Sequence, residues 1–409
     1  MLVVTLTLLF LLSFIGIFIS KSMLSPEFIS PFGWGVILLL YLVLNHGLYN
    51  LSDKVLIIVL LWNFSLFLGV LITRFFLMLK NKKIKNKRSE ADFNLLSFGV
   101  YRFYYWVSII GFFPTLYIIY KQTQAIGGDF FYSLRMANTG IIESDISLGI
   151  FIYVYVFANI AYFTEFILIK KGSSKKRFVI LLLINFILAI TTASKSAFLF
   201  LMISTLVIYL LKNKIFFPNF KVVKYSFVTI ILMISIQTLR DSGSSAKIDG
   251  STLLYTYLLG GLPALDKIVN SEMSSSQFGQ NTFSLVINFL KKIGFKENIS
   301  KNYVNDITYD SYINVPYPTN VYTVIGPIWL DFSYLGVVLS AFFIGILVCF
   351  FYIEANKKSW ALIVYGYLFC ILVLQFFGEY IFTNMSLLLQ IILLSYLLYF
   401  FSNRKLVWK

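Results

Sequence analysis

Five ionisable residues stand beside long apolar runs, and their types suit a charged substrate. They are Arg135, Lys195, Arg240, Asp331 and Glu379. Ionisable side chains at the boundary of a bilayer are costly and often functional. A guanidinium group binds phosphate oxygens through paired hydrogen bonds, and a carboxylate accepts a proton from an attacking hydroxyl. The set predicts a site in which the three cations hold a diphosphate while Asp331 or Glu379 acts as base.

Each of these residues also has a purely structural interpretation. Arg135 and Lys195 would then contact lipid headgroups, and the two carboxylates would cap the helices beside them. Aromatic residues near the set suit the packing of sugar rings, or they form the aromatic belt of a membrane protein. The residues predicted to contact a glycan are Tyr309, Tyr317, Asn320 and Tyr322.

The chain lacks the common signatures of nucleotide and metal chemistry. It contains no Walker loop, no zinc-ligand spacing, no HExxH and no GxSxG. Its one histidine, His46, ends an apolar run and is expected to be a hydrogen-bonded interfacial residue rather than a catalytic one. Cys349 and Cys370 lie in apolar runs and are expected to be small core residues. We therefore predict no metal and no soluble cofactor.

The elements that must position these residues are membrane helices. Hydrophobic residues make up 59% of the 409 residues and charged residues only 13%. Many apolar runs approach the roughly 20 residues that span a bilayer core. We predict an all-α polytopic membrane helix bundle with about eleven spans. They are 2–20, 32–49, 54–79, 103–122, 148–169, 178–194, 196–212, 224–239, 333–353, 359–378 and 381–401.

Basic residues gather in the short loops between these runs. Residues 80–88 carry six and residues 170–177 carry five. The net charge of +16 is therefore a topology signal rather than a sign of nucleic-acid binding. It places the C-terminus in the cytoplasm and two loops, 122–148 and 240–332, outside. The chain then divides into spans 1–239, the large loop 240–332 and a C-terminal part 333–409.

The large external loop contains segments too apolar for a solvated coil. Residues 251–269 are broken by Gly260, Gly261 and Pro263, which favours a re-entrant or surface helix pair. Residues 281–295 place Phe283, Val286, Ile287 and Leu290 on one helical face, with Asn281 or Thr282 as cap. An interfacial amphipathic helix fits this pattern.

The segment 316–336 resembles part of the bacterial O-antigen and capsule repeat-unit polymerases (Wzy type). In that family a P-x-N-x-Y/F-T run leads through an apolar stretch to D-F/Y-G-x-x-G. The matching residues here are Pro318, Asn320, Tyr322, Thr323, Asp331, Phe332 and Gly336, with Ser333 in place of the usual glycine. The turn around Lys195 and the loop after Arg240 resemble further family segments, with Lys195 where the family typically has arginine.

The resemblance implies a GT-C-like membrane glycosyltransferase. Such an enzyme moves a growing glycan from one undecaprenyl diphosphate carrier to a new carrier-linked repeat unit. The reaction takes place on the outer face of the cytoplasmic membrane and uses neither metal nor nucleotide sugar. The expected partners are the lipid-linked oligosaccharide, membrane lipid, a chain-length regulator and a flippase, with no nucleic acid among them.

Two alternatives remain at this point. An O-antigen ligase shares much of the architecture, but ligases typically carry a functional histidine in the large external loop, and residues 240–319 contain none. A repeat-unit flippase would be expected to show two related halves with sites near mid-membrane. The chain shows no internal repeat and little charge within its spans.

Overall fold

The computed structural model describes residues 1–81, 99–128, 130–139, 146–169, 174–192, 194–217, 250–271, 279, 281–294 and 313–403. Within these ranges the chain forms 14 α-helices, one 3₁₀-helix and a two-stranded antiparallel hairpin. The predicted all-α class is confirmed.

Six of the helices are long and apolar enough to cross a membrane. They are α1 (Leu2–Ser20), α2 (Pro26–Val43), most of α3 (Asp53–Asn81), α4 (Gly99–Ile126), the segment Gly149–Leu168 and α14 (Ile325–Ala355). Three shorter apolar helices belong to α8 (Lys195–Lys212), α15 (Ser359–Val373) and α16 (Met385–Asn403). The chain is therefore a helical, multi-pass membrane protein. Each predicted span overlaps a helix except 224–239, which lies outside the described residues.

The chain folds into two compact units, each built from separate stretches of sequence. Unit 1 contains residues 1–85, 248–352 and 371–388. Unit 2 contains residues 86–247, 353–370 and 389–409. Asp331 and Glu379 belong to unit 1, while Arg135 and Lys195 belong to unit 2.

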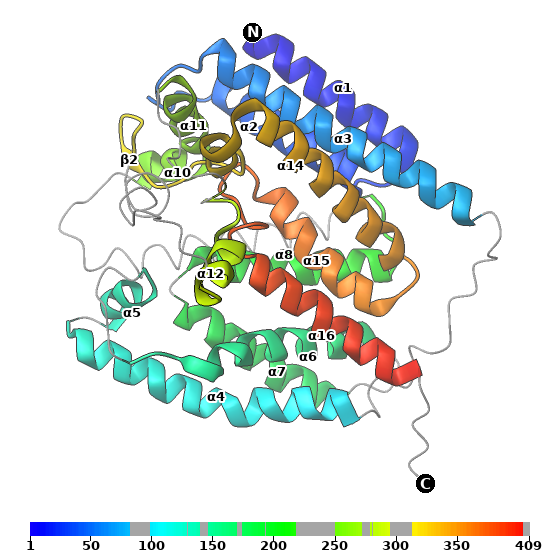
Figure 1. Cartoon of the computed structure of the whole chain (residues 1–409), viewed down its shortest axis with the longest axis vertical. Helices are drawn as coiled ribbons and strands as arrows, with labels where there is room; N and C mark the ends of the chain where they lie inside the picture. The colour runs from blue at the N-terminus through cyan, green and yellow to red at the C-terminus, as the bar shows by residue number, and fades with distance from the viewer. Residues whose placement is uncertain are drawn as a thin grey trace. The chain divides into compact units, whose positions relative to one another are not determined.

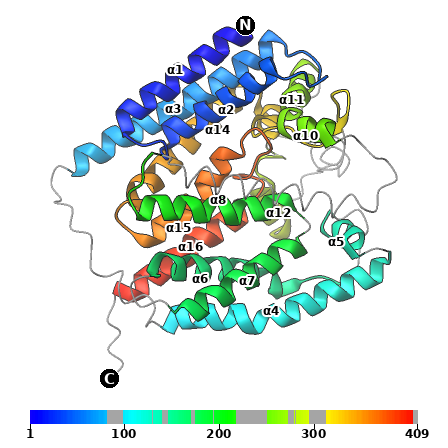
Figure 2. The same cartoon turned by 180° about the vertical axis from the view of Figure 1, so that it is seen from behind.

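The helical layer of unit 1 is formed by α1, α2, α3 and α14. The first three helices pack against one another, and α14 runs beside them (Figures 1 and 2). Gly69 of α3 and Gly345 of α14 allow the two helices to approach closely. A Cβ atom at either glycine would lie 2.2 Å from a carbonyl oxygen of the other helix. Small residues permit such close crossings in membrane helices, where packing rather than hydrophobic burial holds helices together.

Helix α14 starts earlier than the sequence predicts. The expected span begins at residue 333, but α14 runs from Ile325 to Ala355 with a kink at Ser333, where φ is 51° and ψ is −141°. A serine at positive φ is unusual, because its Cβ crowds the backbone in that region. Asp331 therefore lies within a helical segment just before the kink, rather than in the loop that leads to the span.

Short elements cover one end of unit 1. The segment predicted as a broken helix pair forms α10 (Gly250–Leu259) and α11 (Gly261–Asn270), which confirms the pair. The predicted amphipathic helix is α12 (Ser284–Lys292). A hairpin follows, in which β1 (Ile313–Asn314) pairs with β2 (Pro318–Thr319). Of these elements, α10, α11 and the hairpin lie near one end of α2 and α3 (Figure 1).

Unit 2 contains α4, α5 (Phe130–Thr139), the 3₁₀-helix η2 (Gly149–Ile152), α6 (Tyr153–Leu168), α7 (Lys175–Thr191), α8, most of α15 and α16. Its buried core includes side chains of α4, α6 and α7: Phe112, Val154, Ala158, Ile184 and Leu188. The fully buried Glu165 accepts a 2.7 Å hydrogen bond from Arg177 Nε and another from the Tyr101 hydroxyl. Glu165 therefore contributes to the packing of α4, α6 and α7 in unit 2.

Candidate functional site

Asp331 holds the loop that precedes α12. Its Oδ1 accepts hydrogen bonds from the backbone N–H of Asn281 at 3.3 Å and from Asn281 Nδ2 at 2.9 Å. Its Oδ2 accepts from the backbone N–H and the hydroxyl of Thr282, both at 2.6 Å. A carboxylate offers about four acceptor positions. All four acceptor positions are occupied by donors of the loop, so Asp331 holds residues 281–283 in place.

Glu379 shapes the turn between α15 and α16. Its Oε1 accepts from the N–H groups of Ile381 at 2.6 Å and Phe382 at 2.9 Å, and its Oε2 accepts from Thr383 N–H at 2.7 Å. The side chain is only 7% exposed. Burial raises the pKa of Glu379, although the three N–H donors act in the opposite direction. The Thr383 side chain also acts on this carboxylate and lowers its pKa.

Phe283 connects the two carboxylate-bearing segments. Its ring lies 5.7 Å from the ring of Phe332, the neighbour of Asp331, and 5.9 Å from the ring of Phe382 in the Glu379 turn. We call segments 281–283, 321–332 and 374–383 together the carboxylate cluster. The structure thus connects the helical segment that carries Asp331 with the turn that carries Glu379, 48 residues later in the sequence (379 − 331), within unit 1.

Helix α11 packs directly onto the carboxylate cluster. A Cβ atom at Gly261 would lie 2.6 Å from the carbonyl oxygen of Phe376 and 3.1 Å from the Val321 side chain. Tyr257 of α10 stacks on Phe377, with the ring centroids 6.3 Å apart. The apolar sequence around the Gly-Gly pair, which signals the helix break, therefore also supports the Glu379 turn.

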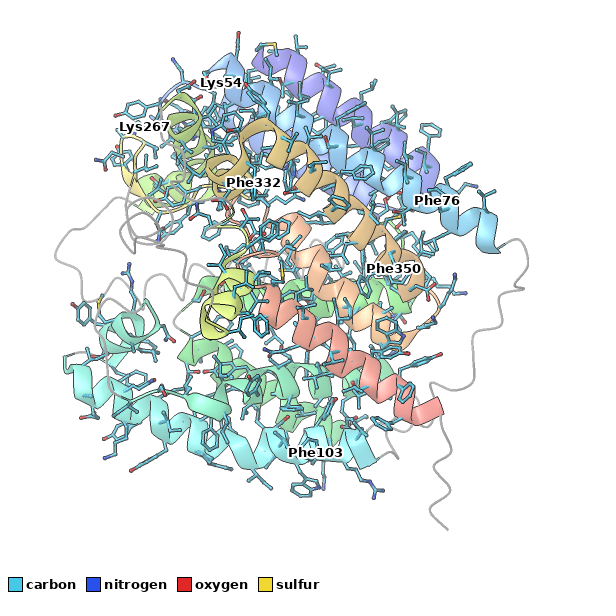
Figure 3. All side chains as sticks on the ribbon, viewed as in Figure 1. Lys54, Phe76, Phe103, Lys267, Phe332 and Phe350 are labelled. Atoms are coloured by element: carbon cyan, nitrogen blue, oxygen red, sulfur yellow. The ribbon has the colours of Figure 1, made fainter. Side chains whose placement is uncertain are left out.

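Two lysines lie at the same end of unit 1 and were not among the predicted site cations. Lys54 Nζ donates to the Val269 carbonyl at 2.7 Å and lies 5.5 Å from the centroid of the Trp329 ring. Lys267 Nζ lies 4.8 Å from the Tyr49 ring. Figure 3 shows both lysines towards the end that carries Phe332, with Phe76 and Phe350 towards the other end. The only sequence signal was their position beside apolar runs.

The other predicted site residues lie in unit 2, around the hairpin of unit 1, or outside the described residues. Arg135 is half-buried on α5 and Lys195 begins α8, both in unit 2, and the Lys195 side chain is outside what the structure describes. Arg240 and Tyr309 also lie outside the described residues. Tyr317 and Asn320 are exposed around the β1–β2 hairpin, whereas Tyr322 is only 5% exposed. A ring as buried as that of Tyr322 packs inside unit 1.

His46 has both ring nitrogens engaged. Its Nδ1 accepts from Leu48 N–H at 2.9 Å, and its Nε2 lies 3.0 Å from the Tyr41 carbonyl oxygen. Because a carbonyl is an acceptor only, Nε2 carries the proton and the imidazole is neutral. His46 is therefore hydrogen-bonded through both ring nitrogens, as the sequence predicts, and its interfacial position stays a prediction. Cys349 and Cys370 are buried free thiols, also as expected.

An ion pair inside the apolar helices was missed by the sequence analysis. Glu27, in the first turn of α2 and fully buried, pairs with Arg74 of α3. The Arg74 guanidinium lies 5.5 Å from the Tyr352 ring of α14. The signal was available, since an arginine within the predicted span 54–79 demands a partner. The sequence alone does not show which acidic residue is that partner, because this depends on how the helices pack.

A buried network around Gln375 was also missed. Gln375 lies just past the end of α15, and its Oε1 accepts from Trp62 Nε1 at 2.7 Å and Trp34 Nε1 at 3.0 Å. All three residues are at most 3% exposed. A lone glutamine near the end of an apolar run gives no sequence signal of such a role.

Comparison with known proteins adds no relative. No family model, no curated protein and no solved structure matches the chain.

Proposed function

We propose that the chain is a glycosyl-transferring polymerase of the bacterial cytoplasmic membrane. It would join undecaprenyl-diphosphate-linked oligosaccharide repeat units into O-antigen or capsular polysaccharide. The spans number about eleven in this proposal, with loops 122–148 and 240–332 outside and the C-terminus in the cytoplasm. The resemblance of segment 316–336 to the Wzy-type polymerases is its starting point.

One observation from the structure supports the proposal most. Asp331 and Glu379 were both selected from the sequence as candidate bases. Phe283 links the first helical segment of α14, which carries Asp331, to the turn that carries Glu379, both within unit 1. A polymerase that uses lipid-linked substrates needs a carboxylate at the end of its membrane helices, where the acceptor hydroxyl and the carrier diphosphate are both within reach.

The hydrogen bonds divide the roles of the two carboxylates. Among the described residues, Asp331 accepts from backbone and side-chain donors of the 281–282 loop, whereas Glu379 accepts from the backbone of its own turn. The raised pKa of Glu379 makes it a better proton acceptor than an ordinary carboxylate. In the proposed reaction Glu379 takes the proton of the acceptor hydroxyl as that oxygen attacks the donor sugar. Asp331 positions the loop that contacts Glu379 through Phe283.

The departing lipid diphosphate needs cations to stabilise its charge. Arg240, with Lys195 and Arg135, fills this role in the proposal. Arg240→Ala should abolish polymer while the protein remains in the membrane, and normal chain lengths in that variant would exclude the assignment. Tyr309, Tyr317 and Asn320 are the proposed glycan contacts, and a chain-length regulator and a flippase are the proposed protein partners.

Deletion of the gene tests the proposed function directly, with the surface glycan separated on a gel. A collapse from a ladder to a single repeat unit on its anchor supports a polymerase. Polymer retained on its lipid carrier indicates a ligase, and repeat units trapped inside the cell indicate a flippase. An unchanged ladder overturns the proposal.

A further inference from the structure

Two tryptophans fix the side-chain amide of Gln375. The indole N–H groups of Trp34 on α2 and Trp62 on α3 donate to Gln375 Oε1 at 3.0 Å and 2.7 Å. An indole N–H is a donor only, so both rings require an acceptor at this point. The Gln375 Nε2 donates to the Leu372 carbonyl at 3.0 Å, which satisfies the other end of the amide. The orientation of the amide is therefore determined by its surroundings.

A hydroxyl group completes this network. Ser30 Oγ lies 3.2 Å from Gln375 Oε1 and 2.9 Å from Asn63 Oδ1. Since a hydroxyl has a single proton, Ser30 donates to one of these oxygens at a time, and the two indoles are the constant donors to Gln375. All of these side chains are buried. Each of these side chains has at least one hydrogen-bond partner, and a buried network of this kind is rigid because a displaced member leaves its neighbours unpaired.

The backbone of Gln375 carries this rigidity into the carboxylate cluster. Its carbonyl accepts from Val324 N–H at 2.7 Å, which ties down the segment before α14. The turn that follows is closed by Phe377 N–H, which donates to the Leu374 carbonyl at 2.9 Å. Glu379 comes four residues after Gln375. One residue thus links helices α2 and α3 to both the Val321–Ile325 loop and the Glu379 turn.

We infer that Gln375 is a positioning residue for Glu379. Gln375 would influence Glu379 through the backbone that joins them and would touch no reacting atom. The inference rests on the proposed function only because that function assigns Glu379 to the site. Replacing Gln375 by leucine removes the acceptor for two buried indoles. A buried donor without an acceptor is costly, and the segment can relieve that cost only by moving. Glutamate at the same position retains an acceptor oxygen of the same reach, and its protonated form also donates to the Leu372 carbonyl as the amide does.

Hydrogen exchange followed by mass spectrometry on the purified full chain tests the inference. The amides of Ile381, Phe382 and Thr383 are protected by Glu379, so they report on its turn. In Gln375→Leu these amides should exchange about tenfold faster, and in Gln375→Glu they should return close to the wild-type rate. Gln122→Leu on α4 is the matched control and should leave them unchanged, because the Gln122 side chain donates to the Ile146 carbonyl at 2.6 Å within unit 2. Tryptophan emission should shift in Gln375→Leu and stay constant in the control.

Unchanged exchange at residues 381–383 in Gln375→Leu, together with an altered tryptophan emission, overturns the inference, because Gln375 then serves only the indoles. If that variant fails to fold, the Trp34→Phe, Trp62→Phe double variant removes the donors instead of the acceptor. It should also accelerate exchange at 381–383, and protection as in the wild type would again overturn the inference.

The surface glycan provides a separate readout for the proposed function. Gln375→Leu should shorten the polymer ladder, and Gln375→Glu should restore it. Faster exchange at residues 381–383 with a normal ladder would show that polymerisation does not require the Glu379 turn. Glu379 would then not be a catalytic residue, and Gln375 would have no positioning role in the reaction. Unchanged exchange overturns the positioning role whatever the ladder shows, while the gene deletion alone decides whether the chain is a polymerase.

Discussion

Asp331 binds Thr282 through two atoms of that residue. The Oδ2 of Asp331 accepts from both the backbone N–H and the hydroxyl of Thr282, each at 2.6 Å. Since Thr282 is only 1% exposed, water does not readily replace these bonds. The contact fixes the start of α12 to the first part of α14, and it makes the role of Asp331 testable apart from any chemistry.

Asp331→Asn should loosen the loop at residues 281–283. The new amide nitrogen cannot accept, so donors now bound to one oxygen lose their acceptor, at a cost of about 1–3 kcal/mol for each buried group. Hydrogen exchange of these amides should accelerate in this variant. Thr282→Val removes only the hydroxyl donor and should have a smaller effect, about 1 kcal/mol. Equal protection in Asp331→Asn and the wild type would contradict the positioning role.

Gly261→Ala should displace the Glu379 turn. The added Cβ would lie 2.6 Å from the Phe376 carbonyl oxygen, which is backbone and cannot rotate away. Overpacking of this kind costs about 1–3 kcal/mol. Gly33→Ala is the matched control, because its Cβ would meet nothing within 4 Å. A lower melting temperature only in Gly261→Ala is expected, and equal melting temperatures would contradict the packing of α11 on Phe376.

These contacts show where sequence reasoning succeeds and where it stops. Continuous apolar runs predicted the membrane helices, since a bilayer imposes length and composition on each span separately. The Gly260–Gly261 pair and Pro263 marked the break between α10 and α11 for similarly local reasons. The selection of Asp331 and Glu379 also followed from a local property, a charge beside an apolar run.

Tertiary contacts account for what the sequence did not predict. The role of Gln375 depends on Trp34 and Trp62, more than 300 residues away in sequence. The helical start at Ile325 rather than at residue 333 depends on Val324, whose N–H donates to the Gln375 carbonyl at 2.7 Å. No local pattern encodes such pairings. The kink at Ser333 could not be predicted from the sequence either. A glycine at this position would have indicated a positive φ, but the residue is serine.

Ser333→Gly should stabilise the protein. Ser333 has a φ of 51° and a ψ of −141°, a region that glycine occupies readily and other residues occupy at a cost of about 1–3 kcal/mol. Part of that gain is offset because glycine also makes the unfolded chain more flexible. The melting temperature of the purified protein should rise in Ser333→Gly. Ser333→Ala keeps the Cβ atom and should show no rise, and equal behaviour of the two variants would contradict the kink.

The stability of unit 1 should depend on the protonation of Glu379. Burial raises the pKa of Glu379 above its ordinary value of 4.5, so the native state binds this proton more tightly than the unfolded state. The stabilising contribution is complete below pH 4.5 and is lost as the pH rises through the raised native pKa. Glu379→Gln should lack this part of the pH dependence. Melting temperatures of both proteins measured from about pH 4 to about pH 8 provide the test, and parallel curves would argue against it.

The Glu27–Arg74 pair should show strong coupling between its two charges. Glu27 is fully buried, and Arg74 is 11% exposed, so neither charge is well hydrated when the other is removed. Arg74→Met alone leaves a buried carboxylate without its cation and should cost about 3–5 kcal/mol. Adding Glu27→Gln to that variant removes the uncompensated charge and should recover most of the loss. Thermal unfolding of the wild type, both single variants and the double variant gives the coupling energy. Strictly additive effects would mean that the pair does not hold α2 to α3. The position of α3 would then be determined by its close contact with α14 at Gly69 and Gly345.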